Sequence, residues 1–228
     1  GLALLALNRP DEAYASIERA IQLKPNHADS LDVRGELLRV AGRHDEAQRD
    51  FHAALRSDPR HAYAHHHLAI SLGATGRAPE SLAYYETALR LKPDYLEARN
   101  NYAAALVAVG RGPEALPHFE RVLRARPEFV DARLNLALAL IRLARPDDAI
   151  GHLESLLRAQ PDSLRVIYNL GVAQAARGRH DLAIAQFERA LALDVSFPSI
   201  HVGLAESLAA TGRTAEARLR YAHARALD

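Results

Sequence analysis

The feature that most constrains this chain is a repeat with a period of 34 residues. Prolines recur at this spacing at Pro25, Pro59, Pro93, Pro127 and Pro161, and the next step falls on Val195. An arginine recurs in seven copies, at Arg9, Arg43, Arg77, Arg111, Arg145, Arg179 and Arg213. A fixed period of this length is typical of stacked supersecondary units whose neighbours bury one continuous core. We therefore expect an array of repeats.

Each copy contains two segments whose apolar residues have helical spacing. A glycine separates them at Gly42, Gly76, Gly110, Gly178 and Gly212, and Asn8 and Ala144 replace it in the other two copies. Proline falls at or just before the start of several second segments, where its missing N–H costs nothing. The pattern predicts helix, tight turn, helix. The first helices of the full copies are expected near residues 28–41, 62–75, 96–109, 130–143, 164–177 and 198–211.

Two positions of the repeat are small and one is bulky, counting Ala28 as position 1. Position 8 holds Gly35, Ala69, Ala103, Ala137, Gly171 and Ala205, and Gly1 in the truncated first copy. Position 20 holds Ala13, Ala47, Ser81, Ala115, Ala149, Ala183 and Ala217. Position 24 holds Ile17, Phe51, Tyr85, Phe119, Leu153, Phe187 and Tyr221. Small residues let paired helices approach to about 8–10 Å, and the bulky residue fills the space beside them.

This helix-turn-helix unit resembles the tetratricopeptide repeat, and the resemblance covers the whole chain. It implies an all-α fold, a right-handed α-α superhelix that forms one solenoid domain over residues 1–228. Seven repeats are expected, with the first truncated: 1–27, 28–61, 62–95, 96–129, 130–163, 164–197 and 198–228. Since no capping helix is added at either end, we expect a fragment of a longer protein. Apolar residues at both ends then predict self-association: Leu2, Leu4, Leu5, Leu219 and Leu227.

The composition argues against several classes of function. Lys+Arg 29 against Asp+Glu 28 leaves a net charge of +1, so no overall field favours nucleic acid. The RNA-reading pentatricopeptide family also has a different period. The longest apolar runs stop short of the ~20 residues that span a bilayer, so we expect no membrane insertion. The absence of cysteine excludes thiolate chemistry and leaves the compartment open.

The resemblance also implies a concave groove lined by positions 2, 5, 6, 9, 12 and 13 of the first helices. Position 6 holds Asn101, Asn135 and Asn169, preceded by His67. This is similar to the asparagine ladder of O-linked N-acetylglucosamine transferases, whose amides bind the backbone of an extended polypeptide. The alternative is that these are surface amides that solvate the groove. On either interpretation we expect them outside the core.

Other groove positions predict charge and aromatic surface. Acidic residues are expected at the N-terminal end of the groove (Asp29, Asp32, Glu36), basic residues in its C-terminal half (Arg142, Arg165), and further contacts at Tyr63, His66 and Tyr168. The chaperone-binding members of the family need lysine at position 2. That position holds Asp29, Tyr63, Glu97, Asp131, Arg165 and Ser199 here, so a chaperone C-terminal carboxylate is not an expected ligand.

The stretch HAYAHHHLA places His61 and His65 at the i, i+4 spacing of a two-histidine metal site. No carboxylate completes a local set, so we favour packing for His65 and groove positions for His66 and His67, and predict no metal. Phosphate-binding loops, nucleophile elbows and zinc-protease motifs are absent from the sequence. We therefore expect neither catalysis nor a cofactor.

Three functions remain open from the sequence. The first is a scaffold that binds an extended peptide or protein segment in its groove. The second is the substrate-docking arm of a larger glycosyltransferase or sulfotransferase, and the third is a self-assembling structural scaffold. The first two share one groove mechanism, so the full reading frame would separate them.

Overall fold

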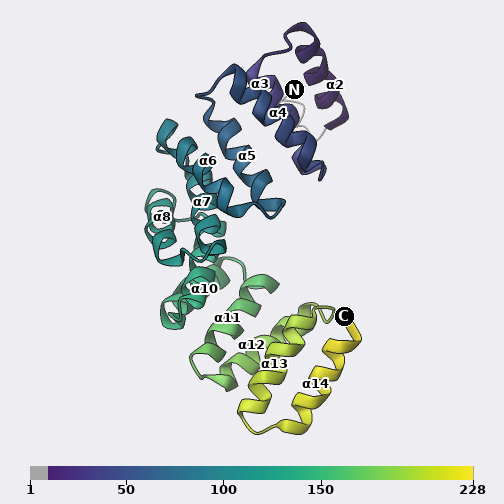
Figure 1. The fold of residues 1–228 in the computed structure, drawn as a ribbon. Coiled ribbons are helices and arrows are strands. Elements are labelled where there is room, and N and C mark those ends of the chain that lie inside the picture. The colour runs from purple at the N-terminus through teal and green to yellow at the C-terminus, as the bar shows by residue number, and fades with distance from the viewer. Residues whose placement is uncertain (1–9, 228) are drawn as a thin grey trace. The chain divides into compact units, whose positions relative to one another are not determined.

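The fold is described by a computed structural model over residues 10–227, and within that range it contains thirteen α-helices and no strand. None of these helices has the length and apolarity needed to cross a membrane. Figure 1 shows the succession of helices along the chain. The chain divides into two compact units, Gly1–His118 and Phe119–Asp228, and the boundary falls inside α8.

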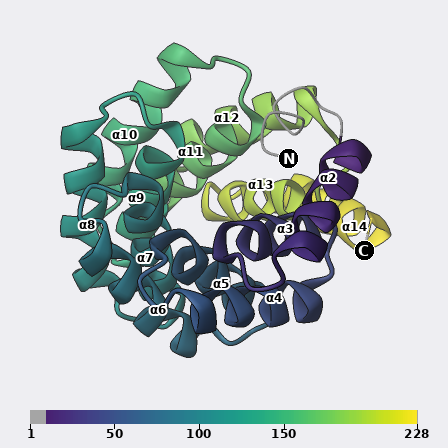
Figure 2. The same cartoon turned by 90° about the horizontal axis from the view of Figure 1, so that it is seen from above.

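The first unit contains helices α2 to α7 and the beginning of α8. Their bounds are α2 (Pro10–Leu23), α3 (Ala28–Val40), α4 (His44–Ser57), α5 (Ala62–Ala74), α6 (Ala78–Leu91), α7 (Leu96–Ala108) and α8 (Gly112–Ala125). Helices that follow one another in sequence pack together, as α3 does with α4 and α5 with α6 (Figure 2).

The second unit contains the end of α8 and six further helices. They are α9 (Val130–Arg142), α10 (Pro146–Ala159), α11 (Leu164–Ala176), α12 (His180–Leu193), α13 (Pro198–Ala210) and α14 (Thr214–Leu227). The all-helical class and the helix-turn-helix repeat are thus confirmed. Each first helix of a full repeat begins where the sequence predicts and ends one residue earlier.

The turn inside each repeat has one recurring backbone geometry. The five turn glycines have φ between 75° and 83°, and Ala144 adopts φ 54° in the same place. The N–H of the following arginine bonds to a carbonyl five residues earlier, as in Arg43 N to Leu38 O at 2.9 Å and Arg145 N to Leu140 O at 2.9 Å. This Schellman closure needs a left-handed residue, which glycine adopts without steric cost.

The recurring arginine follows this turn and precedes the second helix. In five of the six described copies its guanidinium pairs with a carboxylate three residues later, as between Arg111 and Glu114 at 2.6 and 2.7 Å, whereas Arg179 lies 3.6 Å from Asp147. The pairs are exposed to solvent, so each contributes little to stability. Its regular recurrence accompanies a local pairing at the start of the second helix.

The core lies where the small and bulky positions meet. Position 24 is buried in every repeat from Ile17 to Phe187. A Cβ atom added to Gly35 would lie 2.6 Å from the ring of Phe51, and one added to Gly171 would lie 2.7 Å from the ring of Phe187. Ser81, the exception among the position 20 alanines, is buried with its hydroxyl donating to Ala78 O at 2.7 Å.

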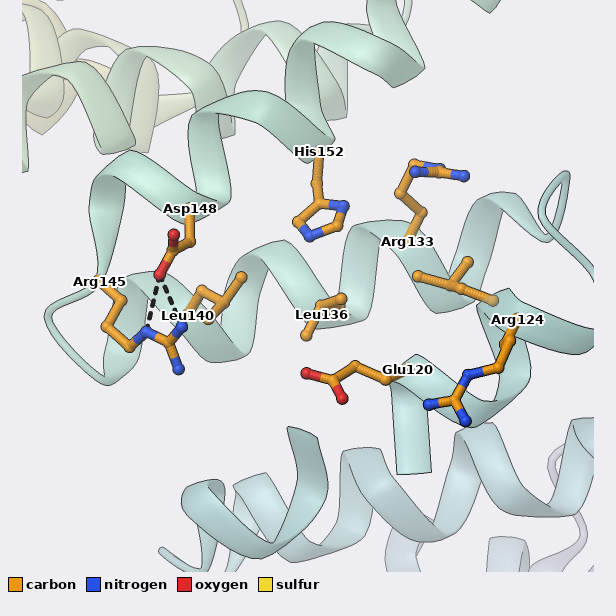
Figure 3. Close-up of a pocket in the computed structure, with 9 residues that line it drawn as sticks. Glu120, Arg124, Arg133, Leu136, Leu140, Arg145, Asp148 and His152 are labelled. Atoms are coloured by element: carbon orange, nitrogen blue, oxygen red, sulfur yellow. Dashed lines mark hydrogen bonds and ion pairs between the residues drawn. The ribbon is translucent and has the colours of Figure 1, made fainter. Parts of the chain in front are cut away.

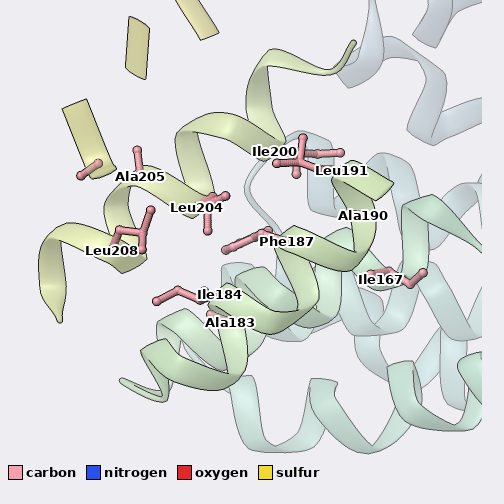
Figure 4. Close-up of a cluster of buried hydrophobic side chains, with 11 residues drawn as sticks. Ile167, Ala183, Ile184, Phe187, Ala190, Leu191, Ile200, Leu204, Ala205 and Leu208 are labelled. Atoms are coloured by element: carbon pink, nitrogen blue, oxygen red, sulfur yellow. The ribbon is translucent and has the colours of Figure 1, made fainter. Parts of the chain in front are cut away.

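Figure 4 shows this core in the last two repeats, where Phe187 and Ile184 of α12 lie beside Leu204 and Leu208 of α13. Within residues 10–227, the outer face of α14 carries exposed apolar side chains. Tyr221, at position 24, is 39% exposed, and Leu219 is 64% exposed, in agreement with the expectation for Leu219. Leu227 is also exposed. The N-terminal expectations for Gly1, Leu2, Leu4, Leu5, Asn8 and Arg9 concern residues outside the described range.

Replacing Ala144 with glycine is expected to stabilise the protein. Alanine pays a steric cost in the left-handed conformation that glycine does not, partly offset by the greater freedom of glycine in the unfolded chain. We expect the free energy of unfolding to rise by roughly 1 kcal/mol, measured by denaturant unfolding. The matched control, Gly110→Ala, should lower it by a similar amount. A destabilised Ala144→Gly variant would contradict this account of the turn.

The open face of α14 is expected to drive association between copies of this chain. Light scattering should show an average mass that rises with concentration, and Leu219→Ser with Tyr221→Ser should reduce the rise because it removes exposed apolar surface. Leu182→Ser is the control, since Leu182 is an exposed leucine on α12. A parent chain that stays monomeric at high concentration would rule this association out.

Candidate binding groove

The acidic groove residues of the first unit are paired within the protein. Asp32 is buried, and its Oδ1 lies 2.8 Å from His67 Nδ1. Asp29 Oδ1 lies 2.9 Å from His61 Nε2, and Glu36 accepts two hydrogen bonds from Arg39 at 2.6 and 2.7 Å. The predicted acidic end of the groove therefore consists of carboxylates that already have partners, and Asp29 alone among them is exposed.

His66 lies in the interior of the first unit, at 4% exposure, and not on an open groove surface. Its Nε2 is 3.0 Å from the amide nitrogen of Asn101, and its Nδ1 is 2.8 Å from the hydroxyl of Tyr95. Because an amide nitrogen only donates, Nε2 accepts and Nδ1 carries the proton of a neutral imidazole. Burial, with smaller contributions from His67 and Arg39, lowers the pKa of His66 to about 3.

Asn101 belongs to the same network. Besides donating to His66, it accepts a hydrogen bond from Asn100 Nδ2 at 3.2 Å. The amide therefore connects α7 to α5, which is a structural role that the sequence did not predict. The reason is that a buried imidazole needs a donor for its second nitrogen, and Asn101 supplies it.

Tyr63 keeps an exposed aromatic surface, at 43% exposure. Lys92 donates to its hydroxyl, and the Lys92 ammonium lies 4.4 Å from the centre of its ring. Beside this pair is a depression of about 350 Å³ lined in part by Arg60 and Leu91. This place combines an aromatic ring with positive charge, and it suits an acidic or polar group on a partner.

In the second unit, Asn169 is also not a surface amide. It is 9% exposed, and its nitrogen donates to Arg165 O at 2.7 Å. The expectation that position 6 lies outside the core is therefore wrong for Asn169. Position 6 packs toward the bulky residue of the preceding repeat, as His67 does on Phe51 with ring centres 5.8 Å apart. Asn135 is partly buried.

Arg142 and Arg165 lie on α9 and α11 as exposed side chains. Tyr168 is partly buried, with its ring centre 5.9 Å from that of Phe187. The basic residues predicted for the C-terminal half are therefore available to solvent.

A pocket of about 650 Å³ lies among α11, α12 and α13. Most of its lining comes from groove positions of two first helices: Tyr168, Val172, Ala175 and Ala176 of α11, and Ser199, Val202, Gly203 and Glu206 of α13. Gly203 is glycine for a packing reason, since an added Cβ would lie 2.7 Å from the ring of Phe187. Small side chains along the groove thus leave space above an aromatic floor.

Sequence reasoning missed Val172, Val202, Phe187 and Ser207 as residues of a pocket. The available signal was the run of small groove residues around Gly203. Two polar atoms of the lining, Ser207 Oγ and His180 Nδ1, are buried without a hydrogen-bond partner in the described part of the chain.

The histidine cluster is not arranged as a metal site. Among residues 10–227, no three or more His, Cys, Asp or Glu side chains gather closely enough to hold an ion. His65 instead directs Nε2 at Pro59 O, 3.0 Å away, and stacks against Tyr84 with ring centres 5.9 Å apart. The predicted packing role of His65 is confirmed.

Comparison with known families adds one consistent result. Tetratricopeptide repeat profiles match residues 1–47, 33–95, 66–127 and 168–227, and a second profile of the same name matches residues 106–170. No curated protein sequence matches the chain. The family matches therefore cover nearly the whole sequence.

Solved structures resemble this fold at low sequence identity. A tetratricopeptide repeat protein from Parabacteroides merdae is 18% identical, with a TM-score of 0.76 over 99% of this chain and 90% of its own. PilW, described as a type IV pilus biogenesis factor, is 21% identical, with a TM-score of 0.79 over 87% and 92%. YrrB, described as having an unusual peptide-binding site, is 19% identical, with a TM-score of 0.67 over 81% and 95%. At these identities the likeness supports the fold alone.

The burial of His66 predicts a loss of stability in acid. Its pKa is about 3 in the folded protein against 6.5 ordinarily, so the unfolded chain binds a proton that the folded chain does not. The stabilisation is complete above pH 6.5 and is lost as the pH falls toward 3, at about 1.4 kcal/mol per pH unit. Denaturant unfolding at several pH values should show that the free energy of unfolding falls less steeply with decreasing pH in His66→Gln than in the parent protein. Equal slopes in both proteins would contradict the assignment.

Proposed function

We propose, from the premise that this chain belongs to the tetratricopeptide repeat family, that it binds an extended peptide segment of a partner protein along its first helices. The observation that carries the proposal is the pocket of about 650 Å³ between α11 and α13. Its walls are groove positions, its floor is the Phe187 ring, and its dimensions lie within the range of ligand pockets.

Asparagines contribute what remains of their hydrogen-bonding capacity. The nitrogen of Asn169 is bonded to Arg165 O, so its carbonyl oxygen is the group that would accept a backbone N–H of the peptide. Asn101 and Asn135 are also proposed to bind the peptide backbone in their own repeats, Asn101 through the second lone pair of the oxygen that already accepts from Asn100. Arg142 and Arg165 would favour acidic side chains, through an attraction that weakens as salt is raised.

Exposed Tyr63 and the Lys92 beside it provide a second contact, in the first unit. His67, a partly buried imidazole held by Asp32, is a further proposed contact. His66 and Asp32 are excluded from direct contact by their burial. The resulting module would recognise backbone through amides and side chains through the pocket and the exposed tyrosine.

A docking arm of a larger glycosyltransferase or sulfotransferase would use the same surface, and it stays an alternative. Self-assembly as a structural scaffold is the second alternative, and the exposed α14 face favours it. Each alternative has its own readout. A docking arm requires a catalytic domain in the full reading frame, and a scaffold requires association without any peptide.

Peptides selected from a displayed random library should lose affinity when the pocket is changed. Val202→Glu should weaken binding by about tenfold or more, because it places a charge where an apolar side chain is expected to sit. Leu193→Glu is the control, since Leu193 is exposed on α12 outside the pocket lining. Dissociation constants would be measured by calorimetry. Equal weakening by both substitutions would assign the effect to charge alone.

The triple variant Asn101→Ala, Asn135→Ala, Asn169→Ala tests the amides on the same peptides. At about 1 kcal/mol for each hydrogen bond, the loss is roughly a hundredfold in affinity. Because Asn101 also supports His66, circular dichroism must first show that the variant is folded at the assay temperature. A folded triple variant that binds like the parent would remove the amides from the proposal.

A further inference from the structure

The second helix of one repeat and both helices of the next repeat meet at a junction. The side chain at position 7 of the first helix enters this junction. It lies between the side chain at position 25 of the preceding repeat and the side chain at position 23 of its own repeat. In the first junction Arg34 fills the space, donating to Asp50 at 2.6 Å twice and to Glu18 at 2.9 Å. The junction is closed by a side chain that bonds on both sides.

Tyr102 closes the corresponding space between α6, α7 and α8. Its hydroxyl donates to Glu86 Oε1 at 2.8 Å, and its ring meets His118 edge to face, with centres 5.0 Å apart and planes at 88°. Burial, and then the bond to Glu86, raise the pKa of Tyr102 to about 12, so the phenol keeps the proton that it donates. The chain thus shows how a phenol ring is held between a glutamate and a histidine.

In the next repeat the glutamate and the histidine around this position are kept, but the tyrosine is not. Glu120 and His152 occupy the places of Glu86 and His118, Arg133 occupies the place of Arg99, and position 7 is Leu136. A cavity of about 570 Å³ opens among α8, α9 and α10, lined by these residues. Figure 3 shows Leu136 between Glu120 on one side and His152 on the other.

Two polar side chains of this cavity, Glu120 and His152, are available to contact a phenol. Glu120 makes no hydrogen bond or ion pair within residues 10–227, whereas Arg145 is paired with Asp148 at 2.7 Å. Burial, and then Arg133, lower the pKa of His152, so the imidazole is neutral near pH 7. Leu136 and Leu140 are buried and form an apolar floor.

We propose that this cavity binds a phenol ring, whose hydroxyl donates to Glu120 and whose face or edge packs on His152, as Tyr102 does between Glu86 and His118. Glu120 can accept the hydrogen bond of a phenol hydroxyl, and the leucine floor disfavours a fully polar ligand. The site uses positions 4, 7 and 11 of α9, which differ from the groove positions. It is therefore independent of the proposed peptide groove.

The ring could come from a free phenol or from a tyrosine side chain, and two probe pairs distinguish these sources. The first pair is p-cresol against toluene, and the second is N-acetyl-tyrosinamide against N-acetyl-phenylalaninamide. Binding would be measured by NMR titration of the Leu136 methyl and His152 imidazole signals. We expect the hydroxylated member of at least one pair to bind about tenfold tighter, since a hydrogen bond to a charged group depends on that hydroxyl.

Leu136→Tyr is the central variant, because it places in the cavity the ring that the preceding junction already has. It should abolish binding of the probe and raise the thermal midpoint by roughly 2–4 °C. Glu120→Gln should reduce the preference for the hydroxyl while the fold persists. Tyr102→Leu should create a second phenol site, so that two probe molecules bind where one did before.

The outcomes divide clearly. Hydroxyl-dependent binding that Leu136→Tyr removes supports the proposal, and the responding probe pair identifies the source of the ring. Equal affinity for both members of each pair, or binding unchanged by Leu136→Tyr, overturns it. If Tyr102→Leu does not fold, the titrations of the parent, Glu120→Gln and Leu136→Tyr still decide the question.

Discussion

The close contact between a small residue on the first helix and a bulky one on the second is the constraint on which the rest depends. At Gly35 and Gly171 the approach is so close that even a Cβ would collide with the rings of Phe51 and Phe187. The Phe187 ring also lies against the following repeat, at Gly203. One buried ring therefore fixes both the pairing within a repeat and the stacking of the next, so stability is shared between neighbours. The ring of Tyr221, which no repeat covers within residues 10–227, is exposed.

This contact explains why polar residues of the proposed groove are less free than their sequence positions suggest. Position 6 faces the bulky residue of the preceding repeat, so His67 lies against Phe51 and Asn169 is buried. A buried amide or imidazole must find partners inside the protein. His66, Asn101 and Tyr95 do so in one network across two helices. Ligand recognition is then left to exposed groups, to the remaining hydrogen-bonding capacity of the groove amides, and to the pocket above Phe187, where the neighbouring side chains are small.

The junctions between repeats share one arrangement of helices but are occupied by different side chains. Arg34 closes one junction with ionic hydrogen bonds, and Tyr102 closes another with a phenol held by Glu86. Leu136 leaves a cavity within an equivalent frame of glutamate and histidine. Because each junction involves only neighbouring helices, one substitution can open or close it without altering the others. A repeat protein can in this way carry separate sites on surfaces that its period makes alike.

The sequence by itself determined the helices, the turns and the apolar faces. These features depend on residues close together in the sequence. The period placed each first helix within one residue of its observed end. The spacing of the turn glycines identified Ala144 as a turn residue, and it adopts φ 54°. The tertiary structure alone decided that His66 is neutral and buried, that Asn169 bonds within its own helix, and that Leu136 borders a cavity. These facts depend on side chains from adjacent helices, such as Tyr95 beside His66. A repeat period states which face of a helix is covered, but the partner that each polar atom meets there depends on the side chains of the helices packed against it.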